Sequence, residues 1–209
     1  MTNETAIVQN HSALIAEFTG GSSGDVEMMI GIGLVKDSDA VFFQYMGDDA
    51  QPQALVLPSS GKPLTRLANV RLTGIGVAEN VGEFGATKLN LYLQSNQGRT
   101  IMLTSGITTL WSQCVVNSLM GLKPVTQLFT LDSWKGKDGR RPCFAAVRAN
   151  GQKVSDNTMY QLLADARATR DQSKVEKIMR EAIDSLATAL GGPVEEATID
   201  VATNEEVPF

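Results

Sequence analysis

The sequence predicts an α+β fold that is mainly β: a five-stranded Greek-key barrel with extra N-terminal strands and C-terminal helices. Short apolar stretches bounded by turn residues follow one another through residues 26–149, which favours strands. One stretch with helical spacing interrupts them at 107–122, and longer helical spacing begins at Ser155. At 209 residues, the chain has room for one large domain, or for one domain with appendages.

The first elements are a flexible segment and a group of short strands. Residues 1–25 end in GGSSGD, a composition typical of a flexible segment. The apolar stretches 26–35 and 40–46 lie on either side of KDSD and are expected to form a hairpin. A third strand is expected at 54–58.

Three strands are expected next, at 67–78, 87–95 and 99–105. Gly74 and Gly76 interrupt the alternation of the first, which indicates a bulge or a sharp bend in a long strand. The second strand alternates cleanly, turns at NQG and continues into the third.

A helix and two further strands complete the β domain. The stretch 107–122 has apolar residues at helical spacing and ends at Gly121 and Pro124, so a helix is expected there. The stretches 125–134 and 141–149 flank the loop KGKDGR and are expected to form another hairpin.

The C-terminal part is expected to be helical and then disordered. Residues 155–190 have the apolar spacing of helices, with a break near Asp171 to Ser173, and should pack on the β domain or dimerise. Residues 191–209 contain five acidic residues and no basic one, which is typical of a disordered tail. The predicted organisation is therefore a flexible segment at 1–25, a β domain at 26–154, the helices and the acidic tail.

The order of elements from residue 67 onward is a long bent strand, two strands, a helix and two strands joined by a loop. This is the layout of an oligonucleotide/oligosaccharide-binding (OB) barrel, which has its helix between the third and fourth strands. A bent first strand suits this barrel, because that strand serves both of its sides. Other small β-proteins with one inserted helix have the same order.

Alternation predicts which side chains face into the barrel. Leu89, Leu91 and Leu93 share one face of their strand, and burying them at roughly 1.5–3 kcal/mol each makes that face the inner one. The inward positions of 143–149 are Cys143, Ala145, Val147 and Ala149. In 127–134 the alternation is ambiguous, because Leu128 shares a face with Asp132 and Trp134, and we assign Phe129 and Leu131 to the inner face. The outward positions are Trp134, Phe144, Ala146 and Arg148.

The middle of the chain is basic although the net charge is −5. Residues 123–153 contain seven basic residues against two acidic ones, whereas residues 1–60 contain one against eight. Such a basic segment can bind a polyanion, or it can be a solvated hairpin.

Aromatic rings among cations are what single-stranded nucleic acid requires. Unpaired bases stack on the rings for about 1–3 kcal/mol each, while Lys and Arg hold the phosphates. An aromatic residue on a strand can also belong to the core or pack on a partner, and Trp111, on the apolar face of its helix, is expected in the core. The residues predicted to bind nucleic acid are Lys88, Tyr92, Trp134, Lys135, Lys137, Arg140, Arg141, Phe144 and Arg148.

The chain ends in EEVPF. This ending resembles the acidic tip of bacterial single-stranded DNA-binding proteins and several phage counterparts, with Glu in place of the usual Asp and Val in place of the usual Ile. In that family the Phe ring and the terminal carboxylate dock into an apolar pocket that basic residues line on a partner protein. The resemblance implies the same role for Glu205, Glu206, Val207, Pro208 and Phe209, which would recruit replication and repair proteins.

The resemblance also implies the function of the whole chain. It predicts a non-catalytic protein that coats and protects single-stranded DNA during replication, recombination and repair. The remainder of the chain does not closely match the common bacterial barrel, so a divergent phage or plasmid type is favoured. Two alternatives stay open: a Whirly-like regulator that binds melted DNA on a curved sheet, and a scaffold that binds only proteins.

Enzyme and metal chemistry find little support in the sequence. It has no Walker loop, zinc cluster or nucleophile elbow, and the single His11 cannot anchor a catalytic triad. We therefore expect no catalytic residue, no metal and no cofactor. Two scattered cysteines, Cys114 and Cys143, and the absence of an apolar run of 18 or more residues favour a reducing, cytoplasmic setting without a membrane span.

Overall fold

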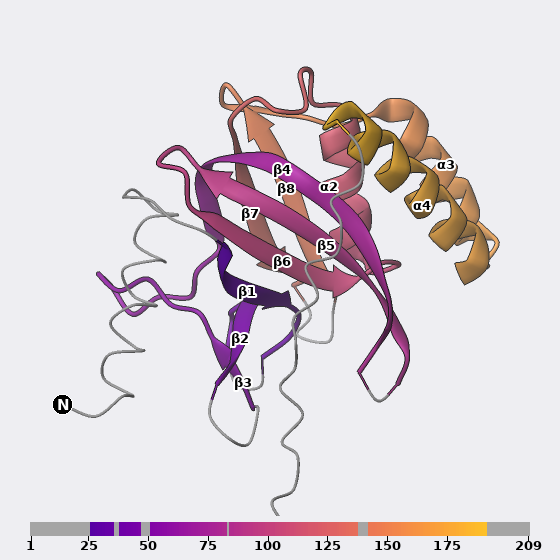
Figure 1. The fold of residues 1–209 in the computed structure, drawn as a ribbon. Coiled ribbons are helices and arrows are strands. Elements are labelled where there is room, and N and C mark those ends of the chain that lie inside the picture. The colour runs from indigo at the N-terminus through magenta and orange to yellow at the C-terminus, as the bar shows by residue number, and fades with distance from the viewer. Residues whose placement is uncertain (1–25, 36–37, 47–50, 83, 138–141, 192–209) are drawn as a thin grey trace, which may run out of the picture.

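A computed structural model of the chain describes residues 26–35, 38–46, 51–82, 84–137 and 142–191. Within these ranges it contains a sheet of nine strands and three helices (Figure 1). The α+β class that the sequence predicts is therefore confirmed.

The strands occur in two blocks with one helix between them. The strands are β1 (Val26–Ile32), β2 (Phe42–Met46), β3 (Gln51–Ala54), β4 (Arg66–Val81), β5 (Ala86–Ser95), β6 (Thr100–Gly106), β7 (Phe129–Lys135), β8 (Cys143–Ala149) and β9 (Gln152–Lys153). The helices are α2 (Leu110–Met120), α3 (Asn157–Ala168) and α4 (Gln172–Ala189). Two details differ from expectation: β3 precedes most of the predicted strand at 54–58, and the two-residue β9 was not predicted.

The order of strands across the sheet is β3-β2-β1-β6-β5-β4-β7-β8-β9. Neighbours are antiparallel except for β1 and β6, which run parallel. The predicted hairpin of the first two strands is present as β1–β2. The predicted bend in the long strand is also present, because the β4–β5 register shifts between Leu72 and Gly74.

The sheet is not closed, so the predicted barrel is not what the pairing shows. Strands β4 to β8 do have the expected order, β6-β5-β4-β7-β8, with α2 between β6 and β7. A barrel of this layout would close by pairing β6 with β8. Instead β1 pairs with that edge of β6, with Val26 opposite Thr100 and Gly31 opposite Thr104. The backbone groups of the β6 edge are thereby satisfied by the N-terminal strands.

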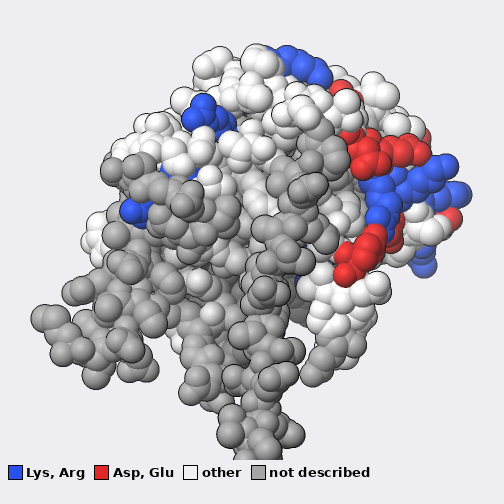
Figure 2. Space-filling view, viewed as in Figure 1, with Lys and Arg blue, Asp and Glu red and all other residues white. Residues whose placement is uncertain are grey.

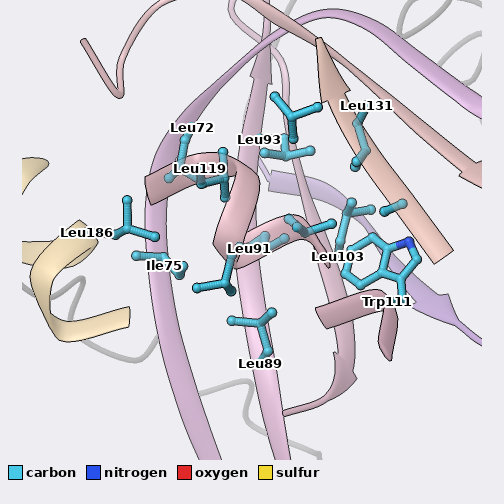
Figure 3. Close-up of a cluster of buried hydrophobic side chains, with 14 of the residues drawn as sticks. Leu72, Ile75, Leu89, Leu91, Leu93, Leu103, Trp111, Leu119, Leu131 and Leu186 are labelled. Carbon is cyan, nitrogen blue, oxygen red and sulfur yellow. The ribbon is translucent and has the colours of Figure 1, made fainter. Parts of the chain in front are cut away.

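The core lies between the curved sheet and the helices. Figure 3 shows side chains of β4, β5, α2 and α4 converging, with Leu186 of α4 beside Ile75 of β4. Leu89, Leu91 and Leu93 are buried as predicted, and Trp111 is 1% exposed, with its ring N–H donating to Ser133 Oγ at 2.9 Å. Ala146, predicted to face outward, is also buried.

The two C-terminal helices are separated where the sequence predicts a break. Arg170 has a φ of 56°, and Asp171 begins α4 by accepting hydrogen bonds from the backbone N–H groups of Ser173 and Lys174. Both helices are held to the rest of the protein by buried apolar residues, such as Leu163 on α3 and Met179 on α4. Figure 1 shows α3 and α4 side by side next to α2. Dimerisation of this segment stays a prediction.

Candidate nucleic-acid interface

An aromatic pair stands on the outer face of β7 and β8. The antiparallel register places Trp134 directly opposite Phe144, and their rings stack with centroids 6.2 Å apart and an interplanar angle of 20°. Trp134 is 44% exposed, whereas Phe129 and Leu131 of the same strand are buried. Burial of the two apolar residues on the inner face therefore directs Trp134 outward, as the alternation predicts.

The cations near this pair have different surroundings. Lys137 is exposed in the turn after β7. Lys135 Nζ donates a hydrogen bond to the carbonyl oxygen of Ser38, which ties the end of β7 to the connection between β1 and β2. Arg140 and Arg141 lie outside the described residues. Among the predicted loop cations that the structure describes, Lys137 is therefore exposed to solvent, and Lys135 is hydrogen-bonded to the backbone.

Arg148 belongs to a three-residue ionic cluster that also contains Arg66 and Asp132. Arg148 Nε lies 2.8 Å from Asp132 Oδ2, and Arg66 Nε lies 2.6 Å from Asp132 Oδ1. Partial burial raises the pKa of the Asp132 carboxyl, but the hydrogen bonds from the two arginines outweigh this and leave its pKa below the usual value. The cluster has a net charge of +1, so Arg148 is a weaker attractor of phosphate than its sequence context indicates.

Sequence reasoning missed Arg66 as a member of this site. The residue precedes Asp132 by 66 positions, and only the pairing of β4 with β7 places the two opposite each other. A local signal did exist in Asp132, an acidic residue between Thr130 and Trp134 on the outward face of a basic hairpin. Such an isolated acid usually pairs with neighbouring cations.

Lys88 and Tyr92 lie on β5, which β4 separates from β7. Tyr92 is half-buried, with Gly74 of β4 on one side and Met102 of β6 on the other. Lys88 lies between Ala78 and Gly106 in the same way and is also half-buried. The structure therefore brings Trp134, Phe144 and Arg148 together on β7–β8 and places Lys88 and Tyr92 in a second group on β5.

The N-terminal strands extend the surface around Tyr92. Met102 is opposite Tyr92 on one side and opposite Met29 on the other, so the three side chains form a row across β5, β6 and β1. Met29 is 45% exposed and Tyr45 of β2 is 56% exposed. The Tyr45 ring packs edge-to-face on Phe43, with centroids 5.3 Å apart.

Phe43 itself is positioned by a glycine. A Cβ at Gly31 would lie 2.3 Å from the Phe43 ring, so only glycine lets the ring cross the neighbouring strand. These N-terminal residues were not predicted as part of the site. The alternation of FFQYM, in which Phe42 is buried and Tyr45 is exposed, was the signal that could have found them.

Charge around α4 is mixed. Figure 2 shows Lys and Arg beside Asp and Glu at the edge of the view where α4 lies. The residues of this patch include Arg180, which binds Glu79 of β4 at 2.6 Å and Glu176 of its own helix at 2.6 Å. The two carboxylates raise the pKa of Arg180, and the hydrogen bond from Arg180 is the largest cause that lowers the pKa of Glu79. This patch is not a basic surface and serves to hold α4 on β4.

The predicted C-terminal tip and the two cysteines differ in how far the structure describes them. Glu205, Glu206, Val207, Pro208 and Phe209 lie outside the described residues. Cys114 and Cys143 are free cysteines, half-buried and buried respectively. Within the described ranges, no three His, Cys, Asp or Glu side chains gather as metal ligands would. In the same ranges, the helices lack the length and apolar character needed to cross a membrane.

No family model matches the chain, and no curated protein or solved structure matches it.

Proposed function

We propose that this protein binds single-stranded DNA without catalysing a reaction on it. The observation that carries the proposal is the stacked pair of the exposed Trp134 and the half-buried Phe144, on neighbouring strands at the base of a loop with cations. Exposing the apolar surface of an indole to water is unfavourable, and a flat apolar ligand that stacks on the ring removes most of this surface from water. Unpaired bases are such ligands, and each stacked base contributes about 1–3 kcal/mol.

In this proposal, the phosphates of the strand bind the cations around the aromatic pair. Lys137 is exposed, and the side chain of Arg148 is 44% exposed beside Asp132. Arg66 adds a third cation, with a side chain that is 63% exposed. Tyr92 and Met29, on either side of the buried Met102, offer a second apolar area against which further bases could stack.

We propose further that β4 to β8 with α2 form an open OB-like module. Its support is the strand order β6-β5-β4-β7-β8 and the position of the helix, both of which this class of fold has. In this view β1 occupies the edge of β6 that the last strand of a closed barrel would use. The loop between β7 and β8 corresponds to a contact element of the class.

The C-terminal tip supplies the second half of the proposed function. Residues 205–209 would recruit proteins of replication and repair, as the resemblance of EEVPF implies. In this proposal, binding of DNA by the sheet and binding of proteins by the tip are separable, because the two activities use different residues.

A curved-sheet regulator of the Whirly-like kind is the second candidate. The open sheet of nine strands favours it, because a wide sheet with exposed Met29 and Tyr45 can receive melted DNA across its face. Contact mapping separates the two candidates. Crosslinks confined to β4–β8 support the OB-like mode, whereas crosslinks that centre on β1 and β2 support the curved-sheet mode.

The deciding experiment is a titration of the protein with oligo-dT, followed by the fluorescence of Trp134 and Trp111. Because Trp111 is buried, a stacked base should quench only the exposed indole, and Trp134→Phe removes most of the change. Affinity should fall with salt at a slope near −0.7 per phosphate contact. Duplex DNA of the same length should bind more weakly. Equal affinity for both, or no binding of oligo-dT, would refute the proposal.

A further inference from the structure

A cleft of about 660 Å³ opens between α2, β8 and α3, at the side of the aromatic pair. Its size is within the range of small-molecule sites. The close approach of the elements around it is fixed by Gly121, where a Cβ would lie 2.6 Å from the backbone of Ser155. The backbone N–H of Asp156 also donates to the carbonyl oxygen of Asn117 at 3.1 Å.

The lining of this cleft contains a buried amide that lacks a partner. Asn117 is 7% exposed, and its Oδ1 accepts no hydrogen bond. The neighbouring amide of Gln113 is satisfied, since its Nε2 donates to Thr108 O at 2.7 Å and its Oε1 accepts from Arg167 Nη1 at 2.6 Å. An unpaired buried acceptor is costly, so a ligand that donates an N–H to Asn117 is favoured.

Charge and ring chemistry narrow the choice of ligand. Lys153 and Arg167 line the cleft, and none of the described residues that line it is Asp or Glu. Two cations without an acid select an anionic group. Phe144 and Tyr160 also line the cleft, and Tyr160 is 58% exposed. The combination of an anion site, rings and an unpaired amide matches a phosphate joined to a flat base.

We propose that this cleft binds one nucleotide. The base donates an N–H to Asn117 Oδ1 and lies against Phe144 or Tyr160, while the phosphate binds Lys153 and Arg167. Every nucleobase has an N–H on an accessible edge, so the cleft does not select among bases. Phe144 belongs both to the cleft and to the pair with Trp134, so a strand that crosses the pair reaches the mouth of the cleft. The bound nucleotide can be part of a DNA strand, in which case the inference rests on the proposed function. It can also be a free nucleotide.

Cys114 provides a direct probe of occupancy, because it lines the cleft as a half-buried free thiol. The full chain is alkylated with iodoacetamide alone, with dTMP and with oligo-dT, and the modified peptides are identified by mass spectrometry. With ligand at about ten times its Kd, modification of Cys114 should slow about tenfold. The buried Cys143 is the internal reference and should be unaffected.

Three variants test the assignment of roles. Asn117→Leu keeps the size of the side chain and should weaken dTMP binding about three- to tenfold, because one hydrogen bond is lost. Its Tm should not fall, because the unpaired acceptor is gone as well. Lys153→Ala, at an exposed position, should weaken binding without affecting folding. The matched control is Lys177→Ala, which lines a separate groove between α3 and α4 and should leave binding unchanged.

The outcomes separate the cleft from the proposed function. Protection of Cys114 by dTMP, without binding of oligo-dT, supports the cleft and refutes single-strand binding. Tight binding of oligo-dT with no protection of Cys114 by either ligand, and no effect of Lys153→Ala, overturns the cleft and leaves the proposed function standing. Protection by an acidic peptide but not by dTMP or oligo-dT also overturns the nucleotide assignment.

Discussion

Replacing Asp132 by Asn should strengthen the binding of single-stranded DNA. The carboxylate lies 2.6 Å from Arg66 Nε and 2.8 Å from Arg148 Nε, so it neutralises one of the two charges that the proposed surface offers. A phosphate bound on the far side of the Arg148 guanidinium would lie roughly 7 Å from this carboxylate, because two charge-assisted contacts of about 2.8 Å and the guanidinium itself separate them. At that distance in water, one unit charge is worth about 0.6 kcal/mol, or a factor of about three in Kd.

The salt dependence should change in the same direction. If one or both arginines become free to hold phosphate, the slope of log K against log salt becomes steeper by about 0.7 to 1.4. The assay is the oligo-dT titration repeated at several salt concentrations. Glu79→Gln is the matched control, because it removes the same charge beside Arg180 on the α4 side. An unchanged slope and Kd for Asp132→Asn would show that Arg66 and Arg148 do not contact the bound DNA.

The same variant should lose some stability. Ion pairs of this exposure contribute about 0.2–1 kcal/mol each, so the loss is at most about 2 kcal/mol. Because the pKa of Asp132 is lowered in the folded protein, its contribution is fully present above the ordinary carboxyl pKa of about 4 and is lost as the pH falls through the lowered value. Urea unfolding of both proteins should therefore differ at pH 7 and converge in acid. A difference that grows in acid would contradict this reasoning.

Four further predictions concern binding, recruitment and folding. Trp134→Ala should weaken oligo-dT binding by about 1–3 kcal/mol in the same titration. A loss of binding free energy of only a few tenths of a kcal/mol would show that the indole packs on the protein and does not stack on a base. Phe209→Ala should leave the oligo-dT affinity intact and abolish recruitment of partner proteins, as measured by pull-down with intact and variant tails. Recovery of the same proteins with both tails would show that no partner recognises the tip. Leu91→Ala should lower the free energy of unfolding by about 3–5 kcal/mol, because the side chain is 0% exposed, and a loss below about 1 kcal/mol in urea would contradict the core described above. Asp156→Ala should cost about 1 kcal/mol, because Asp156 Oδ1 accepts from the Met159 N–H at 2.8 Å at the start of α3; an unchanged helix signal and midpoint would show that this cap is dispensable.

Local periodicity explains why so many elements could be predicted. Alternation places Leu91 on the buried face of β5 and Trp134 on the exposed face of β7, and both outcomes follow from the two-residue repeat of a strand. Helical spacing predicts α2, and the break before α4 is found at Asp171, where a capping side chain is available. Each of these features depends on residues close together in the sequence.

The sequence by itself thus determined the helices, most of the strands, most of the inward positions and the outward positions of Trp134 and Phe144, but not β9 or the burial of Ala146. Only the tertiary structure decided that β1 pairs with β6 and leaves the sheet open, that Arg66 and Asp132 meet across β4 and β7, and that a cleft forms at Asn117. The physical reason is that pairing across a sheet is chosen by competition among all available strand edges. That competition depends on the packing of the whole core, and a local pattern of residues contains no information about that packing.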